Sequence, residues 1–207
     1  MKVAFINGSP KREKSASRTI LLALQERLGA PAGSHIFHIS ALGGEEAPDF
    51  LAGCDAIIFA FPLYVDGIPA YLLRFLEEIK NDIASIAPKA RVYAIVNNGF
   101  YEGEQNALAL QMMENFCLSS GLQWGQGLGV GAGGMVQAAP VGSGPMKNLG
   151  QALDGMAENI LRLQAAETRF VAPNFPRFLY KAGAHLGWRA QARKNGLKAK
   201  DILARGV

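Results

Sequence analysis

Short apolar runs that alternate with helical patterns constrain the fold of this chain more than any other feature. Residues 2–7, 56–61 and 91–96 form apolar runs of strand length, and residues 35–39 and 123–130 are weaker strand candidates. Runs that are apolar at nearly every position are typical of parallel strands covered on both faces. The sequence therefore predicts a buried parallel sheet.

Helical periodicity fills most of the intervals between these strands. Apolar residues recur at helical spacing in residues 16–28, 69–79, 104–120 and 147–163. Strands that alternate with helices predict an α/β fold, and five strands suit a doubly wound parallel sheet in the order 2-1-3-4-5. Ligands of such sheets bind beyond the carboxyl ends of the strands, where the winding direction reverses. The loops after the first, third and fourth strands are therefore the candidate site.

The first loop, residues 8–19, is rich in hydroxyl and basic side chains. It joins a strand to a helix and contains four hydroxyls, on Ser9, Ser15, Ser17 and Thr19. Phosphates bind to hydroxyl donors, positive charge and the amide groups at a helix start. An ordinary helix cap by Ser15 or Ser17 explains one or two of these hydroxyls but not the whole set. We therefore expect a phosphate site.

Several phosphate-binding classes lack their defining residues here. Residues 8–19 contain neither a G-x-G-x-x-G pattern nor a G-x-x-x-x-G-K-[ST] pattern, which argues against a resident dinucleotide and against a P-loop NTPase. A low-molecular-weight phosphatase needs a nucleophilic cysteine in this loop, and none is present.

The second and third loops offer apolar and aromatic walls. Residues 61–70 (FPLYVDGIPA) follow the third strand, and residues 97–103 (NNGFYEG) follow the fourth. Each loop alone is also compatible with a hydrophobic segment packed under a helix or with a tight turn. One phosphate cradle and two walls for a planar ring together match FMN, which has one phosphate and one large flat ring.

Three segments resemble a known family. Residues 6–24, 59–77 and 96–135 (INGSPKREKSASRTILLAL, FAFPLYVDGIPAYLLRFLE and VNNGFYEGEQNALALQMMENFCLSSGLQWGQGLGVGAGGM) resemble the FMN loops of flavodoxin-like NAD(P)H-dependent FMN reductases. The likeness is greatest to a bacterial branch of small flavoprotein oxidoreductases and covers most of residues 1–165. The cysteine cluster of the iron–sulfur relatives is missing, so an iron–sulfur cluster is not expected.

Fourteen residues are expected to bind FMN: the resemblance implies thirteen of them, and Lys11 is added as a cation of the first loop. The first loop would hold the phosphate, the second would contact the isoalloxazine ring, and the third would flank it. The residues are Ser9, Lys11, Ser15, Ser17, Arg18 and Thr19 in the first loop, Pro62, Leu63, Tyr64 and Val65 in the second, and Asn98, Gly99, Phe100 and Tyr101 in the third. The glycine-rich stretch 125–144 receives no role.

The resemblance also implies a reaction. NAD(P)H would reduce FMN, and a small acceptor (a quinone, a free flavin or a nitro compound) would take the electrons, so no catalytic side chain is expected. Two alternatives are a flavodoxin-type electron carrier and a non-catalytic flavin sensor. Reductases of this family commonly form dimers, so a homodimer is expected.

Charge divides the chain into two expected domains. Residues 1–168, the expected FMN domain, carry 12 basic and 16 acidic residues, whereas residues 169–207 carry 9 basic residues and one acid. This basic, helical extension also contains Phe178 and Trp188. Packing or dimerisation is the first interpretation, contact with an anionic membrane surface is the second, and nucleic acid is not expected because no recognition motif is present.

The remaining composition fits a cytoplasmic protein. No apolar run is long enough to span a bilayer, and the first apolar stretch is too short for a secretion signal. Cys54 and Cys117 lie in apolar segments and are expected to be buried core residues rather than a disulfide. No metal site is expected, because His35 and His38 have no further ligands nearby in the sequence.

Overall fold

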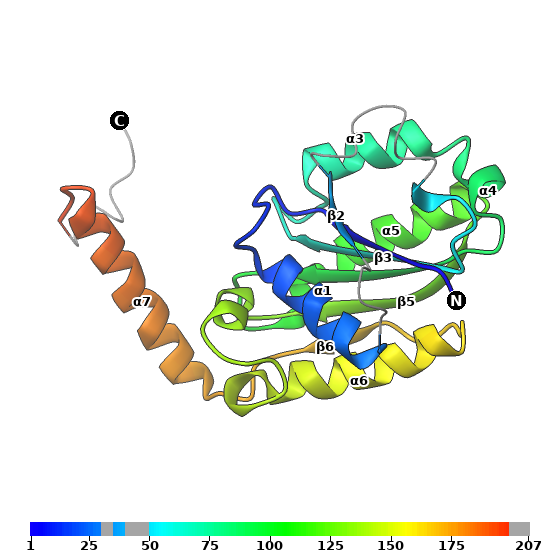
Figure 1. The fold of residues 1–207 in the computed structure, drawn as a ribbon. Helices are drawn as coiled ribbons and strands as arrows, with labels where there is room; N and C mark the ends of the chain where they lie inside the picture. The colour runs from blue at the N-terminus through cyan, green and yellow to red at the C-terminus, as the bar shows by residue number, and fades with distance from the viewer. Residues whose placement is uncertain (30–34, 40–49, 199–207) are drawn as a thin grey trace. The chain divides into compact units, whose positions relative to one another are not determined.

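The computed structural model of this chain describes residues 1–29, 35–39 and 50–198 (Figure 1). The chain divides into two compact units, Met1–Pro173 and Asn174–Val207. The first unit contains the sheet and its covering helices. Within residues 174–198, the second contains one helix.

The first unit is built on a six-stranded parallel sheet in the order β2-β1-β3-β4-β5-β6. The order predicted for the first five strands is confirmed, and a sixth strand extends the sheet beyond β5. The strands are β1 (Val3–Asn7), β2 (Ile36–His38), β3 (Ala56–Pro62), β4 (Arg91–Asn97), β5 (Gln123–Val130) and β6 (Arg169–Val171).

Strand β6 lies just beyond residue 168, where the sequence suggested that the FMN domain ends. Its three residues, Arg-Phe-Val, pair with Leu128–Val130 of β5. A run this short, with one charged residue, gives no strand signal of its own. It becomes a strand because pairing with β5 supplies its hydrogen bonds.

Helices cover both faces of the sheet (Figure 1). Helices α1 and α6 pack on one face, and α3 and α5 pack on the other. Among the described residues, this unit contains helices α1 (Ala16–Arg27), α3 (Ala70–Ile79), α4 (Ile83–Ile86), α5 (Ala107–Ser119) and α6 (Lys147–Leu161), with short 3-10 turns η2 (Gly103–Asn106), η3 (Gly133–Gln137) and η4 (Gly144–Met146).

Two apolar clusters hold these layers together. Phe59 and Phe61 of β3 pack with Leu72 of α3 on one face, and Phe5 of β1 packs with Ile20 of α1 on the other. All five side chains are at most 1% exposed. Burying a side chain of this size stabilises a fold by about 1.5–3 kcal/mol. Alternate residues of each central strand therefore help to hold the helices on opposite faces of the sheet.

Both cysteines are buried and free, as predicted. Cys117 of α5 is fully buried, and burial raises the pKa of its thiol to about 12. Burial also raises the pKa of Cys54. Both thiols are therefore protonated and unreactive near neutral pH.

The glycine-rich stretch 125–144, which received no role from the sequence, is folded. It supplies most of β5 and then the turns η3 and η4. A Cβ on Gly129 would lie 2.7 Å from the carbonyl oxygen of Gly103. The glycines of β5 thus let neighbouring backbone approach the strand more closely than any side chain would allow.

The second unit contains helix α7 (Arg177–Lys194), which confirms a helical C-terminal extension. Ala192 is its one buried residue among those described. Within the described ranges, no helix combines the length and apolar character needed to cross a bilayer.

Candidate functional site

A cavity of about 260 Å³ lies among the three loops singled out in the sequence. It is lined by the first loop, by the ends of β3 and β4 with the residues after them, and by η3. The lining residues are Ser9, Lys11, Lys14, Ser15, Ala16, Ser17, Pro62, Leu63, Tyr64, Asn97, Asn98, Gly99, Gly133, Gly134 and Gln137.

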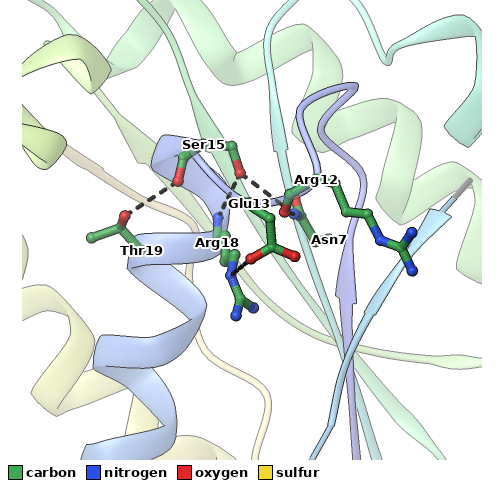
Figure 2. A network of polar contacts seen from close by, with 6 residues as sticks. All are labelled: Asn7, Arg12, Glu13, Ser15, Arg18 and Thr19. Carbon is green, nitrogen blue, oxygen red and sulfur yellow. Dashed lines mark hydrogen bonds and ion pairs between the residues drawn. The ribbon is translucent and has the colours of Figure 1, made fainter.

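Ser15 organises the first loop (Figure 2). It caps helix α1, and its Oγ accepts a hydrogen bond from the backbone N–H of Arg18 at 3.2 Å. The Thr19 hydroxyl donates to the Ser15 carbonyl oxygen at 3.2 Å, and Arg18 Nε lies 3.6 Å from Glu13 Oε2. The cap and these contacts fix the start of the helix beside the cavity.

Three buried serines in this region use their Oγ atoms as hydrogen-bond acceptors. Ser9 Oγ accepts from the Lys11 N–H at 3.2 Å, Ser15 Oγ accepts from Arg18 N–H, and Ser17 Oγ accepts from Asn97 Nδ2 at 2.8 Å. A hydroxyl has one proton to donate besides its acceptor sites. Among the described residues, none of the three O–H groups has a protein acceptor, so each is able to donate to an anion.

Asn97, the last residue of β4, links two of the loops. It is 5% exposed, and its Nδ2 donates both to Ser17 Oγ and to the Phe61 carbonyl oxygen at 3.0 Å. The backbone N–H of Leu63 donates to the Asn97 carbonyl oxygen at 2.8 Å. The residues expected from the sequence include Asn98 but not Asn97, although an amide side chain at the end of a buried apolar strand indicates a polar role at that edge of the sheet.

Asn98 shapes the third loop and binds it to η3. Its Oδ1 accepts from the Phe100 N–H at 2.9 Å, and its carbonyl oxygen accepts from the Gly133 N–H at 2.6 Å. Tyr101 turns its hydroxyl to the Pro173 carbonyl oxygen at 3.4 Å. Phe100 and Tyr101 are not among the residues that line the cavity.

The second loop is a tight two-residue turn. Tyr64 and Gly67 exchange backbone hydrogen bonds of 3.1 and 3.0 Å across Val65 and Asp66. Val65 and Asp66 have φ values of 48° and 56°. A turn with both central residues at positive φ normally carries Asn-Gly, so Val-Asp here is strained. The Val65 side chain is fully exposed and does not line the cavity.

Comparison with known proteins identifies the architecture. The protein-family models and the curated proteins searched give no match to this sequence. Among solved structures, an NADPH-quinone reductase from P. pentosaceus superposes with a TM-score of 0.57 at 17% identity, over 76% of this chain and 98% of that one. The chain has the flavodoxin-like fold.

Two further structures with the flavodoxin-like fold are similar to this chain. An NADH:FMN oxidoreductase (EMOB) in its apo form gives a TM-score of 0.56 at 18% identity, over 80% of this chain and 91% of that one. A flavodoxin from Streptococcus pneumonia TIGR4 gives 0.54 at 17% identity, over 78% of this chain and 99% of that one.

In this flavodoxin-like fold, nine of the fourteen residues expected to bind FMN line the cavity. They are Ser9, Lys11, Ser15, Ser17, Pro62, Leu63, Tyr64, Asn98 and Gly99, whereas Arg18, Thr19, Val65, Phe100 and Tyr101 do not line it. Lining residues that sequence reasoning missed are Lys14, Ala16, Asn97, Gly133, Gly134 and Gln137.

The cavity fits a phosphate attached to a flat ring. The three serine hydroxyls and the basic residues Lys11 and Lys14 contribute groups whose chemistry suits an anion. Pro62, Leu63 and Tyr64 of the second loop add apolar and aromatic groups to the same lining. A Cβ at Gly99 or at Gly134 would meet no protein atom within 4 Å, so both glycines border open space.

His38 supports the first loop from strand β2. It is 7% exposed, and burial lowers the pKa of its imidazole, while hydrogen bonds with the backbone of Ser9 and Lys11 act in the opposite direction. Because burial dominates, His38 is neutral at neutral pH and adds no charge behind the first loop. Across the ranges that the structure describes, no three His, Cys, Asp or Glu side chains are grouped to hold a metal ion.

Proposed function

We propose that this protein is an FMN-dependent oxidoreductase that takes hydride from NAD(P)H and passes the electrons to a small acceptor such as a quinone, a free flavin or a nitro compound. The observation that carries the proposal is a single cavity in which three buried serine O–H donors and two lysines lie beside an apolar and aromatic wall. Two similar structures are named as an NADPH-quinone reductase and an NADH:FMN oxidoreductase.

Each side of the cavity would have its own task. Ser9, Ser15 and Ser17, with Lys11 and Lys14, would hold the FMN phosphate. Pro62, Leu63 and Tyr64 would contact the ring and exclude water from it, and Asn98 and Gly99 would border its other side. Bound FMN supplies the hydride-accepting chemistry, so the side chains bind and orient rather than transfer protons.

The deciding experiment is an anaerobic absorbance titration of the FMN-loaded protein with NADPH and then with NADH. We expect the visible flavin bands to bleach with one or both donors, and a quinone added afterwards to restore them. Bands that do not bleach with either nucleotide would rule out this reaction.

A flavodoxin-type electron carrier is the second candidate, because a flavodoxin is among the similar structures. Steady-state turnover separates the two. A reductase consumes NAD(P)H continuously in the presence of a soluble quinone, whereas a carrier binds FMN tightly and shows no such turnover.

A further inference from the structure

Helix α7 cannot cover its own apolar side chains. Residues 174–198 contain a single helix and no second helix or strand. Its large apolar side chains are exposed to 72% at Phe178, 65% at Leu186 and 64% at Trp188. Exposed apolar groups gathered on one short element mark a surface that binds something outside that element.

The charge of this segment indicates the chemistry of the partner. Residues 174–198 carry six basic residues, and the sequence has no acidic residue between Glu167 and Asp201. The positive charge is therefore not balanced within the segment. An anionic partner gains electrostatic attraction from these cations as well as contact with the exposed apolar groups.

The arrangement of side chains on α7 places aromatic and basic groups close together. Phe178, Lys181, His185 and Trp188 follow at intervals of three or four residues, so aromatic and basic groups share one helix face. A lipid headgroup layer accommodates both together, because aromatic rings lie at the interface while Lys and Arg reach the phosphates.

Nucleic acid fits this surface less well. Single strands stack their bases on aromatic side chains and contact cations, but exposed aliphatic groups have no partner there. Leu186 and Leu197 are 65% and 50% exposed, and Leu179 is also exposed. These side chains gain free energy in a lipid interface and none on a phosphate backbone.

We infer that residues 174–198 dock this protein onto an anionic lipid surface, with Phe178, Leu186 and Trp188 entering the headgroup layer and the basic side chains contacting lipid phosphates. The attachment is peripheral and reversible. It does not depend on the proposed redox reaction, since neither FMN nor NAD(P)H takes part in it.

The test uses the full-length protein and sedimentation with phosphatidylcholine vesicles that contain or lack phosphatidylglycerol. We expect pelleting only with phosphatidylglycerol and release at about 1 M salt, where surface charges are screened. Equal binding to both kinds of vesicle, or binding to neither, overturns the inference.

Tryptophan fluorescence tests the depth of contact. The chain has two tryptophans, so Trp124→Phe leaves Trp188 as the sole reporter. We expect its emission to shift to shorter wavelength when phosphatidylglycerol vesicles are added. An emission maximum that does not change while the protein pellets contradicts insertion of Trp188.

Matched charge variants test whether the basic residues of α7 bind the vesicles. Arg189→Gln combined with Arg193→Gln should weaken vesicle binding about 25-fold, since each basic residue near an anionic surface contributes about fivefold. Lys89→Gln, an exposed lysine of the first unit, is the charge control and should change little. Equal effects of the double variant and the control would contradict the assignment to α7.

The aromatic residues have their own control. Phe178→Ala combined with Trp188→Ala should reduce pelleting, whereas Leu118→Ala, which removes a 71% exposed side chain from α5, should not. If the aromatic variant instead dissociates an oligomer in sedimentation velocity and leaves vesicle binding unchanged, a second copy of the chain covers this surface and the inference is wrong.

Discussion

On the side of β1, the cavity is lined by buried serines whose oxygens accept hydrogen bonds from the protein, whereas on the side of β3 it is lined by partly exposed apolar groups next to a strained turn. Ser9, Ser15 and Ser17 are at most 4% exposed, but Tyr64 is 45% exposed. The hydrogen bonds of the fold hold the serine side in place, so substitutions there should alter both the stability of the protein and its binding of FMN. Residues on the side of β3 can be substituted with little loss of stability.

Asn97→Leu should have the largest effect, because it removes the amide that connects Ser17 on the serine side to Phe61 of β3. The variant leaves Ser17 Oγ and the Phe61 carbonyl oxygen without their Asn97 donor. Losing partners for buried polar groups should lower the free energy of unfolding by about 2–3 kcal/mol, measured by urea denaturation. Asn115→Leu, at an exposed position on α5, is the control. If both variants lose a similar free energy of unfolding, Asn97 has no special role in stabilising the serine side.

Ser17→Ala should weaken FMN binding about 10- to 150-fold, because a hydrogen bond to a charged phosphate contributes about 1.5–3 kcal/mol. Thr19→Ala is the matched control, since the Thr19 hydroxyl donates to the Ser15 carbonyl oxygen and does not line the cavity. Titration of FMN by fluorescence quenching measures both. If the two variants bind FMN equally well, the phosphate does not contact Ser17.

Val65→Asn combined with Asp66→Gly should stabilise the protein by about 1 kcal/mol, because Asn-Gly adopts positive φ at lower cost than Val-Asp. Asp82→Gly is the control, since φ of Asp82 is −103° and glycine brings no relief there. A denaturation midpoint that falls in the double variant would show that the turn is not strained.

The sequence predicted the sheet well, because buried parallel strands leave a strong local signal. The runs at β1, β3 and β4 are apolar at nearly every position, and helices separate them. Strand β6 has no such signal, since its three residues become a strand only by pairing with β5. Local pattern therefore predicted the core and missed an edge that depends on tertiary contact.

The candidate site was predicted less completely, for two physical reasons. Loop membership does not fix the direction of a side chain, so Val65, Phe100 and Tyr101 belong to the expected loops without lining the cavity. Gly133 and Gly134 reach the cavity because η3 folds back against Asn98, a long-range contact that composition does not reveal.

The two buried thiols make this chain well suited to site-specific labelling. Cys54 and Cys117 are the only cysteines in the sequence, both are buried, and the pKa of each is raised. Maleimides react with the thiolate, so a cysteine introduced at an exposed position, as in Leu118→Cys, would react far ahead of both native thiols at neutral pH. A spin label or fluorophore can therefore be attached at one chosen position without first removing either native cysteine.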